Sequence, residues 1–110
     1  MRHWTLDEAV AALPEVRGQV QRLRVLAKAR PTANGQGARL DEEIASILAD
    51  LNSEGIVVRD ADRGLIDFPA LAPSGATYLL CWLDGEPTID WWHWPDAGFA
   101  GRTPITDPPP

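Results

Sequence analysis

The chain has 110 residues, of which 45% are hydrophobic and 24% are charged, with a formal net charge of −6. This length suits one domain, and the composition excludes a disordered chain, a collagen-like chain and a disulfide scaffold. Its apolar runs fall short of the roughly 20 residues that cross a bilayer. The sixteen acidic and ten basic residues include no basic run, so neither nucleic acid nor an anionic membrane surface is expected as a partner. The N-terminus lacks the apolar segment of a signal peptide, which predicts a cytoplasmic protein.

A long first helix is predicted over residues 5–29. Thr5 and Glu8 have the spacing of a capping box, in which each side chain accepts a hydrogen bond from the other residue's backbone N–H. Pro14 lies inside the stretch and predicts a kink, because it cannot donate to the carbonyl of Val10. The apolar residues nevertheless continue on both sides of it at alternating spacings of three and four, at Leu6, Ala9, Leu13, Val16, Val20, Leu23 and Ala27.

A loop and a second helix follow. Residues 30–38 contain Pro, Asn and two Gly, which indicates a loop. The second helix is predicted over residues 39–53, and Gly55 suits the position after its end. Its apolar side consists of Leu40, Ile44, Ile47, Leu48 and Leu51. Together the two helices are expected to form an antiparallel hairpin over residues 5–53.

From residue 56 the apolar period changes to two, which is typical of strands. Short turns divide this half into four predicted strands, at residues 56–59, 65–71, 76–83 and 88–94. The sequence therefore predicts an α+β fold, an antiparallel helical hairpin packed on a four-stranded antiparallel β-meander. A single domain is expected over residues 1–102, with the sheet at 56–94 and a closing loop at 95–102, followed by an extended proline-rich tail at 103–110.

The turn lengths determine which residues share a face of the sheet. A four-residue turn after Leu71 pairs this residue with Ala76. One face is then almost wholly apolar and is expected to cover the helices, with Ile56, Val58, Ile66, Phe68, Ala70, Leu79, Cys81, Leu83 and Trp92. The opposite face mixes aromatic, aliphatic and charged residues, with Val57, Arg59, Leu65, Asp67, Leu71, Tyr78, Leu80, Trp82, Ile89, Trp91 and His93. A large exposed apolar surface usually marks an interface or a ligand groove, so function is expected on this second face.

Several short motifs occur in order along the chain: Thr5-Leu6-Asp7-Glu8-Ala9 with Leu13-Pro14, Gly64-Leu65-Ile66-Asp67-Phe68-Pro69-Ala70, Leu80-Cys81-Trp82, Gly85-Glu86-Pro87, Trp92-His93 and Gly98-Phe99-Ala100-Gly101-Arg102. Their combination resembles the prokaryotic family of small proteins catalogued as domain of unknown function 2203, over about residues 4–104. The resemblance implies a small cytoplasmic protein without an established biochemical role. It therefore carries over no catalytic or binding residue.

The leading interpretation is a homo-oligomeric, non-enzymatic module that binds a protein partner or a small ligand through the aromatic sheet face. Tryptophan and tyrosine bury much area while keeping a polar group available, as interfaces require. A homodimer is expected because the long first helix presents more apolar surface than the sheet can cover. No catalytic motif points to an enzyme, and no cofactor is expected. The residues assigned to binding are Arg59, Asp67, Tyr78, Trp82, Trp91, His93 and Arg102.

The alternative is a small metal- or anion-dependent enzyme. In this interpretation Asp67, Glu86 and His93 hold a divalent metal such as Mn, Fe or Zn. Arg102 then holds an anion through its guanidinium group. Asp67 and His93 are expected to lie about 10 Å apart across the sheet, too far for a direct hydrogen bond, so that a metal or ligand bridges them.

Simpler roles are available for the same residues. Asp67 can form a cross-strand salt bridge with Arg59, and His93 a hydrogen bond within the aromatic cluster. Arg102 can pair with an acidic residue of the C-terminal half. The single cysteine, Cys81, lies in an apolar stretch and is expected to be a small buried hydrophobic residue.

Overall fold

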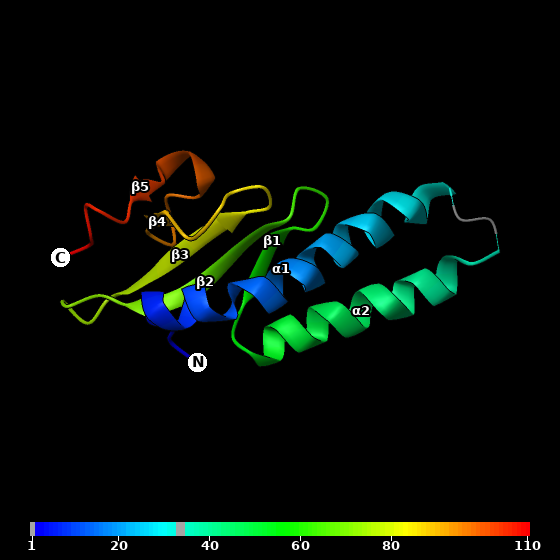
Figure 1. The fold of residues 1–110 in the computed structure, drawn as a ribbon, viewed down its shortest axis with the longest axis horizontal. Coiled ribbons are helices and arrows are strands. Elements are labelled where there is room, and N and C mark those ends of the chain that lie inside the picture. Colours follow the sequence, from blue (N-terminus) through cyan, green and yellow to red (C-terminus); the bar gives the residue numbers. More distant parts are fainter. Residues whose placement is uncertain (1, 33–34) are drawn as a thin grey trace.

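Two antiparallel helices and an antiparallel sheet make up the chain, shown in Figure 1 from a computed structural model that describes residues 2–32 and 35–110. The helices are α1 (Leu6–Ala29) and α2 (Gly37–Ser53), with short 3-10 turns at Arg30–Thr32 and Phe99–Gly101. The strands are β1 (Val57–Asp60), β2 (Leu65–Leu71), β3 (Thr77–Leu83), β4 (Trp91–His93) and β5 (Thr103–Pro104). The predicted α+β class is confirmed. In the described part of the chain, no helix has both the length and the apolarity needed to cross a membrane.

Helix α1 begins at the predicted capping box. The Glu8 N–H donates to Thr5 Oγ1 (3.1 Å), and the Thr5 N–H donates to Glu8 Oε1 (2.9 Å). The helix continues past Pro14, which is exposed, so the proline does not end it. The side of the helix that faces the protein interior is buried at Ala9, Leu13, Val16, Val20, Leu23 and Leu26. The predicted apolar period therefore identifies the face that packs on the rest of the chain.

The five strands follow one another in the order β1-β2-β3-β4-β5, each antiparallel to its neighbours. The predicted meander is confirmed, but the prediction of four strands is wrong. Thr103 and Pro104, expected in a free tail, pair with Trp92 and Trp91. Proline is tolerated there because β5 is an edge strand, where a ladder N–H is not required on the outer side.

The last residues lie against the sheet instead of extending away from it. The Trp92 indole N–H donates to Asp107 O (2.9 Å), and the Ser74 N–H donates to Pro110 O (3.1 Å). Pro109 is buried. A proline-rich segment can be held in this way because proline lacks an N–H but keeps a carbonyl that accepts hydrogen bonds. These contacts hold the predicted proline-rich tail against the rest of the chain.

The register between β2 and β3 differs by one residue from the predicted one. Leu71 pairs with Thr77 and not with Ala76, because the turn between the strands has one more residue. The Ala72 N–H donates to Ala76 O (2.8 Å) across this turn, and Gly75 supplies a φ of 90°. A one-residue shift moves every side chain of a strand to the other face. The core under the helices therefore contains Tyr78, Leu80 and Trp82. The opposite face carries Leu79, Cys81 and Leu83.

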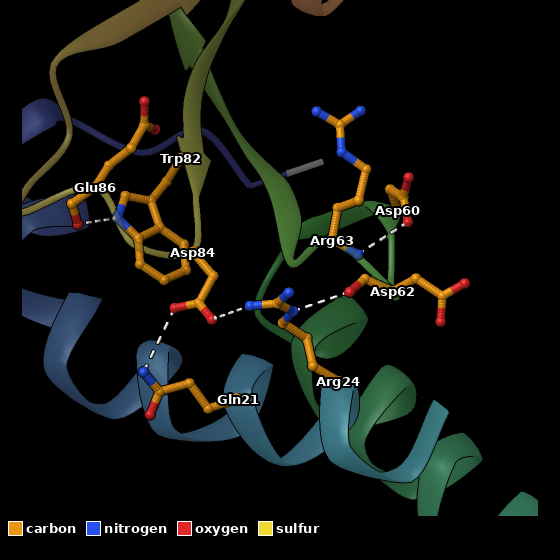
Figure 2. Close-up of polar contacts among 8 residues, drawn as sticks. All are labelled: Gln21, Arg24, Asp60, Asp62, Arg63, Trp82, Asp84 and Glu86. Carbon is orange, nitrogen blue, oxygen red and sulfur yellow. Dashed lines mark hydrogen bonds and ion pairs between the residues drawn. The ribbon is translucent and has the colours of Figure 1, made fainter. Parts of the chain in front are cut away.

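Polar contacts fix the middle of α1 to the end of the sheet where two turns meet (Figure 2). Arg24 Nη1 donates to Asp84 Oδ2 (2.8 Å), and Arg24 Nε donates to Asp62 O (2.9 Å). Gln21 Nε2 donates to the other carboxylate oxygen of Asp84 (3.4 Å). Asp62 follows β1 and Asp84 follows β3, so α1 is tied to both turns. Beyond this junction the two helices extend past the sheet (Figure 1).

Gly64 tests how closely this junction is packed. A Cβ at this position, where φ is 72°, would meet Asp84 Cβ at 2.7 Å, Arg24 Cδ at 2.9 Å and Val20 Cγ1 at 3.0 Å. Gly64→Ala is therefore expected to combine backbone strain of about 1–2 kcal/mol with overpacking of about 1–3 kcal/mol. Gly75→Ala is the matched control, because Gly75 also has positive φ but nothing lies within 4 Å of an added Cβ. Urea denaturation should show the larger loss of unfolding free energy for Gly64→Ala, and equal losses would contradict the close packing.

Candidate functional site

Two ionisable side chains, Asp67 and His93, are buried on the sheet face opposite the helices, with 0% and 4% of their surfaces exposed. His93 Nε2 lies 3.0 Å from Asp67 Oδ1. The prediction that these side chains are too far apart for direct contact is therefore wrong. The observed register places Cys81 on this face of β3, in place of Tyr78 and Leu80. The imidazole reaches across this small residue to the carboxylate.

Three neighbouring strands each contribute one side chain to this cluster: Asp67 from β2, Cys81 from β3 and His93 from β4. Their carboxylate, thiol and imidazole atoms all lie within 4.8 Å of one another. Cys81 is fully buried, as predicted, but it lies beside two ionisable groups that the predicted register had placed on the other face. Burial, and after it the Asp67 carboxylate, raises the pKa of the Cys81 thiol to about 12. The thiol therefore keeps its proton at neutral pH.

Further contacts fix the orientation of the Asp67–His93 pair. Arg59 Nε donates to Asp67 Oδ2 (2.7 Å), which is the predicted cross-strand salt bridge, and His93 Nδ1 lies 2.8 Å from Trp94 O. A carbonyl oxygen only accepts, so Nδ1 carries a proton, and the contact between Nε2 and Oδ1 needs a second one. The Arg59 guanidinium favours an ionised Asp67. One proton therefore lies between His93 Nε2 and Asp67 Oδ1, and the two side chains form a buried hydrogen-bonded pair.

A cavity of about 170 Å³ opens onto this cluster. Arg59 lies at its edge with 46% of its side chain exposed. The other lining residues are Leu65, Asp67, Cys81, His93, Pro95, Gly98 and Phe99. Three of these belong to the segment between β4 and β5, which closes over this face of the sheet. The volume is comparable to the roughly 150 Å³ cavity that holds one benzene molecule in another protein.

A second, more open hollow of about 330 Å³ adjoins the first, since Phe99 lines both. The Arg102 guanidinium lies 4.8 Å from the Trp91 ring centroid and 4.7 Å from the Phe99 ring centroid. Arg102 Nη2 donates to Glu86 Oε2 (2.6 Å), and the other Glu86 oxygen accepts from the Leu83 N–H (2.7 Å). Arg102 and Glu86 are therefore paired with each other, while Arg102 Nε is buried and makes no hydrogen bond with the residues that the structure describes.

The structure does not bring together the three metal ligands predicted from the sequence. Glu86 is held by Arg102 at the second hollow, away from the Asp67–His93 pair. Cys81 occupies the place beside that pair. Sequence reasoning missed Cys81 as a member of this cluster because it assumed a four-residue turn after β2. A turn with one more residue places Cys81 on the face that carries Asp67.

The predicted aromatic face is not formed. Trp82 is fully buried and donates its indole N–H to Glu86 O (3.0 Å), as Figure 2 shows. Tyr78 packs edge to face on Trp92 with ring centroids 5.7 Å apart. Both Trp82 and Tyr78 contribute to the core under the helices, because the one-residue difference in register places them on the helix-facing side of β3. Trp91 stays on the opposite face and is half-buried.

A larger hollow of about 360 Å³ lies between α1, α2 and the residues that follow α2. Its ionisable lining residues are Glu15, Asp50 and Glu54, all of which are exposed. Solvated carboxylates of one sign do not form a preorganised site. The smaller cavity, which contains the buried ionisable side chains Asp67 and His93 with Arg59 at its edge, is therefore the candidate functional site.

Cys81 gives a direct test of how closed this site is. At pH 8, raising a thiol pKa from 9.0 to about 12 lowers its thiolate fraction by about 1,000-fold, and burial blocks access as well. We expect Cys81 in the chelator-treated native protein to react with a thiol-specific disulfide reagent at least about 100-fold more slowly than in urea-unfolded protein. The chain has one cysteine, so the absorbance of the released product reports this residue alone. Equal rates in native and unfolded protein would contradict the closed site.

Comparison with known proteins gives a family but no relative of known activity. No curated protein and no solved structure matches the chain. Residues 29–105 match the family described as "Uncharacterized conserved protein (DUF2203)". The match includes Arg59, Asp67, Cys81 and His93, whereas the capping box of α1 lies outside it. Because it covers more than half of the chain, the chain belongs to the family called domain of unknown function 2203, as its motifs predicted.

Proposed function

We propose that the chain is a binding module for a small organic carboxylate, which occupies the cavity beside Asp67, Cys81 and His93. The observation that carries the proposal is a cavity of about 170 Å³ that ends on a hydrogen-bonded network of buried polar side chains. Ligand sites combine apolar walls with a few fixed polar groups. This cavity has both kinds of wall.

The polar groups are held in place before any ligand arrives. Asp67 uses one oxygen for Arg59 and the other for His93, and His93 uses its second ring nitrogen for Trp94 O. Side chains held at both ends lose little further conformational freedom when a ligand binds. The network therefore favours binding in a single orientation.

The charges and the walls favour an organic anion. Asp67 and His93, with the proton between them, carry no net charge together, so Arg59 gives the cluster one positive charge. Arg59 donates to Asp67 through Nε, and its Nη atoms make no hydrogen bond with the residues that the structure describes, so they are free to hold a carboxylate. Leu65 and Phe99 provide apolar walls for the body of the ligand.

Benzoate is a suitable probe, because its ring fits the volume and its carboxylate can meet Arg59. We expect saturable benzoate binding by isothermal titration calorimetry, and at least about tenfold weaker binding by Arg59→Gln, equal to about 1.4 kcal/mol. Arg22→Gln is the matched control, since Arg22 pairs with Glu43 on the helical hairpin away from the cavity. Benzamide has the same shape without the charge. Equal binding of benzoate and benzamide, or no effect of Arg59→Gln, would refute the carboxylate site.

The helical hairpin favours a second role, self-association. Beyond the junction with the sheet, each helix can bury only the stripe that faces the other helix. Leu40, Ile44 and Leu48 on α2 accordingly stay half-buried, and Val25 on α1 is 57% exposed. We propose that a second copy of the chain covers this surface, because an isologous contact lets one helix pair cover the other.

Sedimentation velocity tests this second role. The wild-type chain should sediment as a dimer over a series of concentrations, and Val25→Glu should shift it to monomer because the charge would be buried at the contact. Val10→Glu is the control, since Val10 is also an exposed apolar residue of α1 but lies in its N-terminal part, where Ala9 and Leu13 pack in the core. A monomeric wild type, or equal effects of the two variants, would exclude the hairpin contact.

A further inference from the structure

Asp67, Cys81 and His93 have the composition and spacing of a metal site. We infer that Asp67 Oδ1, Cys81 Sγ and His93 Nε2 bind a Zn²⁺ ion whose fourth coordination position opens into the cavity. This inference rests on the proposed function, because the carboxylate of the small ligand then occupies the fourth position. Three protein ligands with one open position are the arrangement of zinc sites that bind exogenous ligands.

The three ligand atoms are already close to the positions that zinc requires. They come from three adjacent strands, lie within 4.8 Å of one another, and include an N–O distance of 3.0 Å between His93 and Asp67. Zinc bonds of about 2.0–2.3 Å in tetrahedral geometry place ligand atoms roughly 3.3–3.8 Å apart. Metal entry therefore needs side-chain movements of a few tenths of an ångström to about one ångström and no rearrangement of the sheet.

The outer contacts orient two of these ligands. His93 Nδ1 donates to Trp94 O, which directs Nε2 toward Asp67 and Cys81, so that Nε2 can become a metal ligand once the proton between it and Asp67 has left. Metal-bound histidines almost always donate their other ring N–H in this way. Arg59 occupies Asp67 Oδ2 and leaves Oδ1 for a metal. The backbone carbonyl just after β4 and the β1 arginine thus position two of the three ligands, His93 and Asp67.

The chemistry of the donors selects zinc over harder cations. A thiolate, an imidazole and one carboxylate suit Zn²⁺, whereas Mg²⁺ and Ca²⁺ prefer oxygen ligands alone. On binding, the thiol proton of Cys81 and the proton between His93 Nε2 and Asp67 Oδ1 pass to solvent, so one Zn²⁺ replaces two protons. The ion then balances the Asp67 and Cys81 charges, and Arg59 leaves one positive charge beside the open position. That charge favours an anionic fourth ligand.

Cobalt(II) is the probe, because a cobalt–thiolate bond produces a charge-transfer band in the near ultraviolet. We expect the chelator-treated wild-type chain to bind one Co²⁺ with this band, and an equimolar amount of Zn²⁺ to abolish it. Any such band must come from Cys81, the one cysteine of the chain. Cys81→Ser should remove the band, and His93→Ala should weaken Co²⁺ binding at least about tenfold. His3→Ala is the matched control, since His3 is exposed and contacts Thr77 Oγ1.

The wild-type spectrum alone can overturn the inference, even if a buried variant fails to fold. A wild-type chain that shows no thiolate band with excess Co²⁺ has no such site. If His3→Ala weakens the band as much as His93→Ala does, His93 is not a specific ligand and the inferred site is wrong.

Benzoate binding distinguishes the zinc inference from the proposed carboxylate module. Benzoate binding that persists in metal-free protein without a cobalt–thiolate band would overturn zinc and support the carboxylate module. A cobalt–thiolate band with no benzoate binding, with or without metal, would support zinc and refute that module.

Discussion

A carboxylate without solvent contact is costly unless it is paired, and Asp67 lies fully buried in the middle of β2. Arg59 on β1 and His93 on β4 compensate it from opposite sides, so four strands must keep one register for the network to form. An apolar residue of similar volume can be as stabilising as a buried ion pair. Stability alone therefore does not account for this network, whereas the proposed role in ligand binding would account for both the charges and the cavity beside them.

The C-terminal residues hold this network in place. β4 has three residues and would make a weak edge strand by itself, but β5 pairs with it on the outer side. The Trp92 indole is anchored to the backbone of Asp107, and His93 is the next residue along β4. The segment between β4 and β5 then supplies Phe99 and its neighbours as a wall of the cavity. The position of the imidazole thus depends on residues that resemble a flexible tail in the sequence.

Local signals were sufficient to predict most of the fold. The capping box at Thr5, the three-four apolar spacing and the change to a period of two each depend on neighbours in the sequence. Which side chains of β3 face the helices depends on the length of one turn. One additional residue in that turn places Trp82 under the helices and Cys81 on the opposite face, the reverse of the prediction. β5 was missed because its prolines argue against a strand unless the edge position is known. The Arg59–Asp67 pair was anticipated as a cross-strand contact, whereas the cluster with Cys81 required the correct register.

A proton links His93 Nε2 and Asp67 Oδ1 in the structure, and the proposed metal ion would link the same two atoms. In the metal-free chain a proton joins them, the thiol of Cys81 stays protonated, and the network is a set of hydrogen bonds. With the proposed Zn²⁺ the same atoms would become ligands, and the contacts from Arg59 and to Trp94 O would not have to break, because they use other atoms of these side chains. A scaffold that keeps its outer contacts in both states does not need to refold to bind the ion. The rigidity that makes the buried pair tolerable is therefore the property that would preorganise it for the proposed metal and, through the open position, for a carboxylate.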